Sequence, residues 1–151
     1  MRRPDAYFVL AGDGPLRKSA SKLARQFDIT DRVIFLGLRQ DIPTIMSAAD
    51  ALLLTSVYEG LPNVLIEAQA LGVPVITTDA GGSREAVDDG VTGFVSPNHS
   101  PHALAQLVLK VISDQKIRTE ARSQGRNRMA RFAPRTMIEQ TVALYGLERA
   151  E

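Results

Sequence analysis

The sequence predicts an α/β protein with a parallel sheet that helices cover on both faces. Short, nearly all-apolar runs alternate along the chain with longer segments whose apolar residues recur at helical spacing. Strands of this composition are typical of parallel sheets buried on both sides. The conspicuous polar or glycine-rich clusters, GDGP, GLRQD, TSVYEGLPN and TDAGGSRE, each follow a predicted strand. Because ligands of such sheets bind beyond the carboxyl ends of the strands, these four loops form the predicted binding edge.

The first part of the chain predicts three strands and two helices. Each strand is a short apolar run that ends at a turn-forming or polar residue. Pro15 precedes the first helix, and Asp41 with the following Ile-Pro marks the entry to the second. The predicted strands cover residues 6–11, 33–36 and 51–54, and the predicted helices cover residues 16–27 and 41–48.

The remainder of the chain predicts two further strands among helices with recognisable end signals. We expect Gly72 to end one helix, Ser83 to cap a brief one, and Ser100 with the proline after it to begin a longer one. The last helical stretch is expected to break near Gly125 and at Pro134. The strands cover residues 73–77 and 93–96, and the helices cover residues 63–71, 83–87, 101–113 and 115–148.

Composition indicates a globular protein large enough for one ordinary domain. The 151 residues are 44% hydrophobic and 23% charged, and the net charge of +1 gives no electrostatic case for nucleic-acid binding. The absence of cysteine excludes disulfides and thiolate metal sites and fits a cytoplasmic location. Apolar runs are far shorter than the roughly 20 residues of a membrane span. The start, MRRPDAYFVL, indicates a buried strand rather than a signal peptide.

Two glutamates stand eight positions apart in the stretch SVYEGLPNVLIEAQALGVPV. Backbone amides from Asn63 to Leu65, at the start of the predicted helix, can point at an anion such as a diphosphate without a metal, and the chain has no Asp-x-Asp pair. Glu67 lies among apolar residues, so it would be costly to bury without a partner, and its two oxygens suit the vicinal hydroxyls of a ribose. Glu59 on the loop would face the sugar end of the same nucleotide-sugar. The alternatives are an ordinary helix start and two surface glutamates.

Other clusters have simpler interpretations. Gly12 and Gly14 indicate a turn, because the third glycine of a dinucleotide fingerprint is absent. His99 and His102 fit the region of a helix cap better than a metal site. A group of arginines near the C-terminus indicates either a solvated helix face or a patch for an anionic membrane surface. Its members are Arg118, Arg122, Arg126, Arg128, Arg131 and Arg135.

Four stretches of the sequence resemble the C-terminal, donor-binding domain of GT-B glycosyltransferases of the retaining family called group 1. They are LAGDGPLR, VIFLGLRQDIP, ADALLLTSVYEGLPNVLIEAQALGVPVITTDAGGSREAV and GVTGFVSP, and they cover roughly residues 6 to 97 in family order. The resemblance implies a Rossmann-like fold and a metal-independent transfer of sugar from a nucleotide-diphosphate donor. It also implies that no cofactor is needed.

The resemblance carries over to individual residues of the E-x7-E motif and its surroundings. It implies that Glu67 binds the donor ribose and that Glu59 contacts the transferred sugar, which makes Glu59 the candidate catalytic residue; no general base is assigned. The backbone after Glu59 is implied to hold the diphosphate, and a segment earlier in the chain is implied to lie beside the base. The first set is Gly60, Leu61, Asn63, Val64 and Leu65, and the second set is Gly37, Leu38 and Arg39.

The chain departs from the family at its start. The family domain begins with one more strand and helix, which carry an arginine and a lysine for the diphosphate, and the acceptor-binding N-terminal domain precedes it. We therefore expect a partial domain over residues 1–151 that binds nucleotide weakly, does not transfer sugar alone, and hides an exposed edge by self-association. In the full enzyme, peripheral membrane contact is an additional expectation. The alternatives are a stand-alone nucleotide-sugar-binding module and a sugar-nucleotide epimerase of similar architecture.

Overall fold

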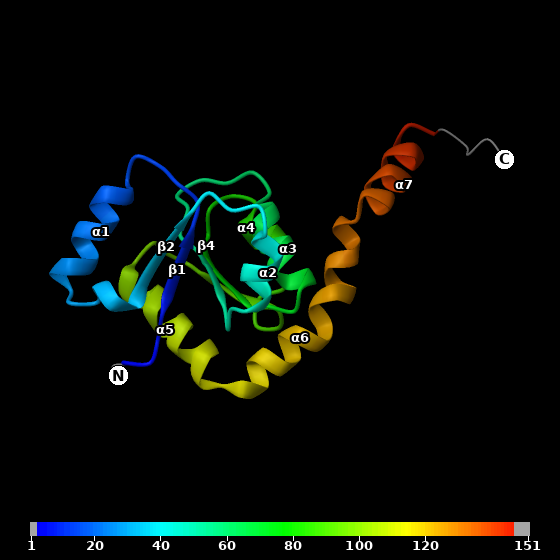
Figure 1. Cartoon of the computed structure of the whole chain (residues 1–151). Coiled ribbons are helices and arrows are strands. Elements are labelled where there is room, and N and C mark those ends of the chain that lie inside the picture. The colour runs from blue at the N-terminus through cyan, green and yellow to red at the C-terminus, as the bar shows by residue number, and fades with distance from the viewer. Residues whose placement is uncertain (1–2, 147–151) are drawn as a thin grey trace. The chain divides into compact units, whose positions relative to one another are not determined.

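A computed structural model describes residues 3–146 of the chain (Figure 1), which falls into two compact units, Met1–Ile42 and Pro43–Glu151. Each unit contains a parallel sheet of its own, with two strands in the first and three in the second. The predicted α/β architecture with parallel strands and flanking helices is therefore confirmed, and its strands are divided between two sheets. Among residues 3–146, no helix combines the length and the apolar character needed to cross a membrane.

The first unit pairs β1 (Phe8–Ala11) with β2 (Val33–Gly37) in parallel. Helix α1 (Arg17–Gln26) and the short 3-10 helix η1 (Thr30–Arg32) connect the two strands, because parallel neighbours need a crossover connection. Side chains of α1 face one side of this small sheet across an apolar groove. The groove is lined by Phe8, Leu10, Ala20, Leu23, Ala24, Phe27, Ile29, Val33 and Phe35.

Strand β1 is much more exposed than its composition predicted. Phe8, Val9 and Leu10 are 40–49% exposed, although the apolar run indicated a buried strand. Within the first unit, β1 pairs only with β2 and α1 packs on one face, so this unit by itself leaves the other face and one edge of the strand uncovered. The position of the strand is confirmed, and its predicted burial is wrong.

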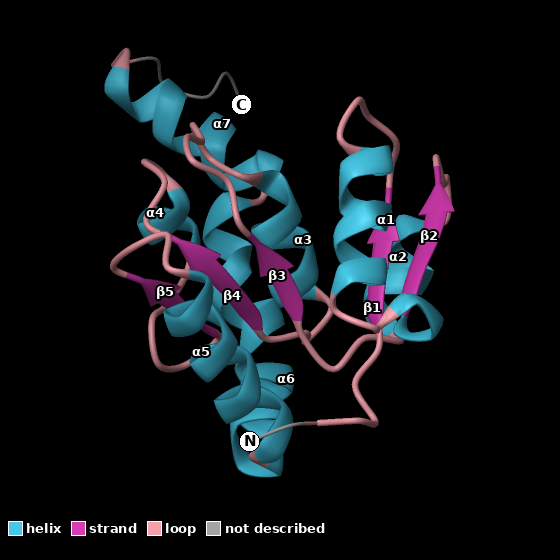
Figure 2. Ribbon diagram, turned by 90° about the vertical axis from the view of Figure 1, so that its left-hand side faces the viewer, coloured by secondary structure: helices cyan, strands magenta, loops and turns pink. Residues whose placement is uncertain are grey.

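The second unit is built on three parallel strands in the order β3-β4-β5. They are β3 (Leu52–Leu54), β4 (Val75–Thr78) and β5 (Gly93–Ser96), with Ile76 beside Leu53 on one side and Phe94 on the other. Every residue of β4 is buried, as expected of a central strand of apolar composition. Figure 2 shows these strands side by side, flanked by α3 and α5.

Helices α3, α4 and α5 each follow a strand of this sheet, and α2 precedes the first of these strands. Helix α5 packs Leu104 and Val111 against Ile76 of β4 in a hydrophobic core cluster. The predicted cap of α5 is confirmed, because the Ser100 hydroxyl accepts a hydrogen bond from the Ala103 amide and a proline follows. The helices are α2 (Ile42–Ser47), α3 (Asn63–Ala70), α4 (Ser83–Ala86) and α5 (Pro101–Ser113).

The C-terminal stretch forms α6 (Gln115–Met129), the 3-10 helix η2 (Ala130–Phe132) and α7 (Pro134–Leu144). The predicted break at Pro134 is confirmed, whereas the break predicted near Gly125 is wrong, because α6 runs through this residue. Gly125 is buried, and a Cβ there would overlap the backbone carbonyl oxygen of Gln69 on α3. The glycine therefore allows two helices to pack closely and does not end one. The predicted helix beyond residue 146 lies outside the described residues.

Candidate functional site

The loop that carries Glu59 follows β3 and is fastened to the loop that follows β4. The Glu59 amide donates to the Ala80 carbonyl over 3.0 Å, and the Gly82 amide donates back to the Glu59 carbonyl over 3.3 Å. The Thr78 hydroxyl, at the end of β4, donates to the Ser56 carbonyl over 2.5 Å. Two of the four predicted loops therefore meet at the carboxyl edge of the sheet of the second unit.

Two glycines allow this close approach. Gly81 has a φ of +70°, and a Cβ there would overlap the Glu59 carbonyl oxygen. A Cβ on Gly82 would overlap the Gly60 carbonyl oxygen. Ser83 does not cap α4 as predicted: Gly82 occupies the cap position, and the buried Ser83 hydroxyl oxygen has no hydrogen-bond partner among the described residues. The glycine pair thus serves a contact between two loops of this chain.

The Glu59 side chain is half-buried and held on one side. The Ser56 hydroxyl donates a hydrogen bond to Oε1 of Glu59 over 2.6 Å. The neighbouring Val57 and Tyr58 are more than 80% exposed, so the carboxylate lies at an open edge of the loop. This arrangement leaves the carboxylate able to accept further hydrogen bonds from a polar ligand.

Helix α3 begins four residues after Glu59 with few of its amides engaged. Pro62 occupies the cap position with no capping side chain, and the Leu65 amide donates to the Pro62 carbonyl over 3.0 Å. Leu65 is also fully buried and its amide already has this partner, so its role in holding a diphosphate stays a prediction. Within residues 3–146, no hydrogen-bond partner is present for the amides of Asn63 and Val64. These two amides are free to donate to a ligand, and the anion site that was predicted around them stays a prediction.

Glu67 is exposed on α3, in contrast to the burial that its apolar neighbours indicated. Leu65, Ala68 and Gln69 form the buried side of the helix, and Glu67 projects from the other side. The argument that this carboxylate needs a buried partner is therefore wrong. An exposed carboxylate can still accept two hydrogen bonds from a ribose, so the role implied by the resemblance stays a prediction.

The segment assigned to the base lies in the first unit, directly after β2. Gly37 has a φ of +66°, and its carbonyl accepts a hydrogen bond from the Gly12 amide over 2.7 Å, so the loops after β1 and β2 meet. Leu38 is 84% exposed. Arg39 donates through Nε and Nη2 to both Asp41 oxygens at 2.7 and 2.6 Å. The hydrogen bond to Asp41 raises the pKa of Arg39, and the same bond lowers the pKa of Asp41. The positive charge of Arg39 is therefore already paired.

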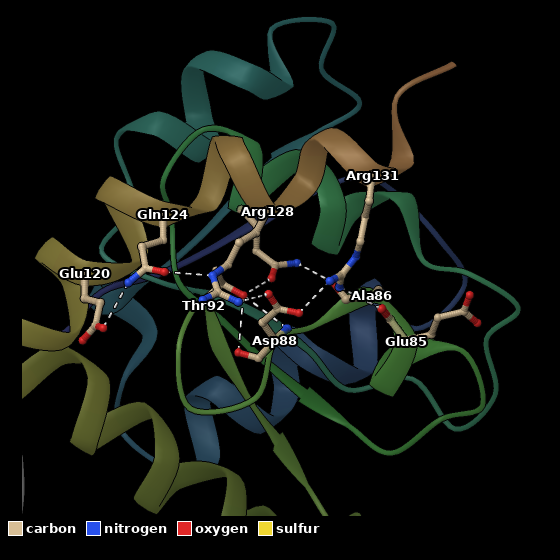
Figure 3. A network of polar contacts seen from close by, with 9 residues as sticks. Glu85, Ala86, Asp88, Thr92, Glu120, Gln124, Arg128 and Arg131 are labelled. Atoms are coloured by element: carbon tan, nitrogen blue, oxygen red, sulfur yellow. Dashed lines mark hydrogen bonds and ion pairs between the residues drawn. The ribbon is translucent and has the colours of Figure 1, made fainter. Parts of the chain in front are cut away.

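A polar network that the sequence did not indicate anchors the far side of α3. The Gln69 side chain donates to the carbonyls of Leu65 and Ala86 at 2.7 and 2.8 Å, and the Thr92 hydroxyl donates to its amide oxygen. Asp88 continues the network to Arg128 and Arg131 (Figure 3). Apart from the bond from Gln69 to Leu65 within α3, these contacts join residues 17 to 43 positions apart in the sequence, so no local pattern reveals them.

The arginine group near the C-terminus has largely structural roles. Arg118 donates to the carbonyls of Val111 and Ile112 at the end of α5. Arg128 and Arg131 pair with Asp88, and Arg135 pairs with Glu139. These contacts favour the interpretation of a folded helix surface, so contact with a membrane stays a prediction without support from the geometry.

A family model described as glycosyl transferases group 1 matches residues 1–128 of the chain. The chain belongs to the group 1 glycosyl transferases. This membership confirms the family that the E-x7-E stretch indicated. The match assigns no roles to single residues, so the donor site at the two glutamates and the amides of α3 stays a prediction.

Named relatives and a solved structure agree with this family. The chain is 51% identical over 92 residues to the Vi polysaccharide biosynthesis protein VipC/TviE of Salmonella typhi, covering 61% of this chain and 16% of the relative. It is 30% identical to N-acetyl-alpha-D-glucosaminyl L-malate synthase of Bacillus anthracis, covering 93% and 37% of the two chains. The crystal structure of Anabaena Alr3699/HepE with UDP-glucose matches with a TM-score of 0.85 and 30% identity, covering 95% and 41%. The group 1 domain thus spans well under half the length of each.

No candidate metal centre accompanies this site. In the part of the chain that the structure describes, no three His, Asp or Glu side chains are grouped closely enough to hold a metal ion. The expectation of a metal-independent reaction rests on the resemblance and stays a prediction.

Proposed function

We propose that this chain is the donor-binding half of a retaining glycosyltransferase, which moves a sugar from a nucleotide-diphosphate sugar to an acceptor hydroxyl. The observation that carries the proposal is the placement of the two glutamates. Glu59 lies on a loop fastened to the end of β4, and Glu67 is exposed on the helix that follows, with the unpartnered amides of Asn63 and Val64 between them in the sequence. The family consists of glycosyl transferases, so sugar transfer is the reaction that these two glutamates would serve.

Each part of the donor is assigned to a group of matching chemistry. Glu67 would accept hydrogen bonds from the two ribose hydroxyls, and Glu59 would accept them from the transferred sugar. The amides of Asn63 and Val64, with the partial positive charge of the helix start, would stabilise the diphosphate as it departs. Gly37, Leu38 and Arg39 are retained as the predicted base contact. The acceptor hydroxyl would come from a separate acceptor-binding domain.

Uridine diphosphate sugars are the first donor class to test. The Anabaena protein with 30% identity was crystallised with UDP-glucose, and its match covers 95% of this chain. Calorimetry of the full-length protein with UDP, GDP and ADP compares the three bases directly. We expect UDP to bind most tightly and the Glu67→Gln variant to bind it about ten- to hundredfold more weakly, because the amide replaces two acceptor positions with one.

The matched control is Glu120→Gln, the same substitution at an exposed glutamate of α6. It should bind UDP as the unmodified protein does. Equal affinity of the Glu67→Gln variant and the control would contradict the ribose assignment. In the full-length protein, acceptor-dependent release of UDP from a UDP-sugar would support transfer. Binding without turnover would instead support a non-catalytic module, and donor conversion without an acceptor would support an epimerase.

A further inference from the structure

We infer that Ser56 is a positioning residue that holds the carboxylate of Glu59 in one orientation for the donor sugar. The inference rests on the proposed function for the role of Glu59, and on the structure for the contact. The Ser56 hydroxyl donates to Oε1 of Glu59 over 2.6 Å, at a distance typical of a charge-assisted hydrogen bond. Neither the sequence pattern nor the family match assigns a role to Ser56.

Ser56 is itself fixed to the sheet. Its carbonyl accepts the hydroxyl of Thr78 over 2.5 Å, and Thr78 is fully buried at the end of the central strand β4. Three residues further along the loop, the Glu59 backbone exchanges hydrogen bonds with Ala80 and Gly82. The backbone of the loop is therefore anchored at both Ser56 and Glu59. Because the Ser56 hydroxyl donates to the Glu59 carboxylate, the carboxylate is held in a defined position as well.

The geometry assigns different tasks to the two oxygens of Glu59. Oε1 accepts from Ser56, whereas Oε2 has no hydrogen-bond partner within residues 3–146. A free glutamate side chain populates several rotamers and loses that freedom when it binds a ligand. A hydroxyl that already selects one rotamer removes part of this cost and presents the second oxygen to a sugar hydroxyl.

The proposed contact of Glu59 with the sugar means that a change at Ser56 should affect the sugar-transfer step and not the affinity for the nucleotide. Glu59 is proposed to contact the transferred sugar, so an error in its orientation affects the reacting sugar and leaves the ribose and base contacts in place. Loss of an interaction made only at the reacting centre lowers kcat with little change in KM. Loss of folded protein would lower the apparent kcat and leave KM unchanged, so rates are compared at equal folded fraction measured by circular dichroism. The Glu59 side-chain couplings and rescue by Ser56→Thr then separate positioning from a role in stability.

Side-chain NMR on the chain tests the contact without reference to any substrate. Scalar couplings of the Glu59 methylene protons should report one fixed rotamer in the unmodified protein and in Ser56→Thr, which keeps the hydroxyl. They should report rotamer averaging in Ser56→Ala. The matched control is Ser123→Ala, which removes a hydroxyl that donates to the Glu120 carbonyl on α6. Averaged couplings in the unmodified protein, or fixed couplings in Ser56→Ala, would overturn the inference.

Kinetics in the full-length protein, with UDP-glucose as the donor and release of UDP as the readout, test the consequence. We expect Ser56→Ala to lower kcat about tenfold with KM changed less than twofold, and Ser56→Thr to restore most of the rate. In a Glu59→Gln background the serine substitution should have no further effect, because the two residues act as a pair. If Glu59→Gln lowers kcat and Ser56→Ala does not, the positioning role is refuted. If Glu59→Gln itself leaves turnover unchanged, the proposed function of Glu59 fails, and the NMR result still decides the contact.

Discussion

The Arg128 guanidinium donates to the Asp88 carboxylate over 2.7 Å, which joins α6 to the turn before β5 across 40 residues of sequence. Arg131 binds the other oxygen of Asp88 at 2.8 Å and also donates to the Glu85 carbonyl at 3.2 Å. Asp88 is largely buried, with 17% of its side chain exposed. Burial raises the pKa of Asp88, but the hydrogen bonds from Arg128 and Arg131 outweigh it, so its pKa lies below the ordinary value. One carboxylate thus fastens α6 and η2 to the turn before β5 within the second unit.

The substitution Asp88→Asn should lower the free energy of unfolding by about 1–2 kcal/mol at pH 7. A hydrogen bond to a charged group contributes about 1.5–3 kcal/mol, and the partial exposure of both arginines reduces that contribution. Urea unfolding followed by circular dichroism measures the difference. The control is Asp50→Asn, because Asp50 is 78% exposed and its contact with Arg118 is 3.8 Å, so we expect little change.

The pH dependence of this contribution has a definite sign. Because the folded-state pKa of Asp88 is lowered, its stabilisation is present above the unfolded pKa of about 3.9 and is lost as the pH falls through the lower folded-state pKa. The difference between the unmodified protein and Asp88→Asn should therefore be constant near neutrality and shrink below about pH 4. A difference that grew on acidification would contradict the ion pair.

The substitution Glu59→Gln should separate nucleotide binding from the sugar step. We expect unchanged affinity for free UDP and a fall of at least tenfold in turnover of a UDP-sugar by the full-length protein, because the proposed partner of Glu59 is the sugar. Calorimetry with UDP and kinetics with the UDP-sugar measure the two quantities on the same variant. Equal losses of affinity for UDP and for the UDP-sugar would contradict the assigned division of labour between Glu59 and Glu67.

The substitution Gly82→Ala should displace the loop that carries Glu59. Gly82 has a φ of −68°, which alanine adopts freely, so the effect comes from overlap of the new Cβ with the Gly60 carbonyl. Overpacking of this kind costs about 1–3 kcal/mol, which urea unfolding would detect. Gly14→Ala is the matched control, because a Cβ at Gly14 meets no atom within 4 Å. Equal stability of the two variants would show that the two loops are not in close contact in solution.

The substitution Gly125→Ala tests two opposing effects within one helix. Alanine favours a helix interior by about 1 kcal/mol over glycine. The new Cβ would overlap the Gln69 carbonyl oxygen and approach the Gln69 carbonyl carbon to 3.0 Å, so α6 and α3 must move apart. We expect net destabilisation by about 1–2 kcal/mol in urea unfolding. Asn127→Ala, at an exposed position of the same helix, should be neutral or stabilising; a stabilised Gly125→Ala would refute the tight packing.

Local pattern was sufficient for most of the elements and for the edge that carries the candidate site. Apolar runs followed by polar or glycine-rich loops placed all five strands to within about two residues, because strand composition and turn chemistry act over a few positions. The same logic placed Ser100 as a cap and Pro134 as a break, since each acts on its own helix turn. Glu59 and Glu67 could be selected in advance because both lie within one continuous motif.

Only the tertiary structure decided burial, close packing and long-range pairing. Glu67 is exposed despite its apolar neighbours, and β1 is exposed despite its apolar composition, because burial depends on which other elements cover a face. Gly125 looked like a helix break, yet it serves contact with Gln69 on a distant helix. The hydroxyl of Ser56 was one of many in the sequence, and only the folded loop, anchored at Thr78, brings it within 2.6 Å of Glu59. The sequence pattern indicates which side chains favour burial or hydrogen bonding. Which side chains come within hydrogen-bonding distance of one another depends on how the whole chain packs.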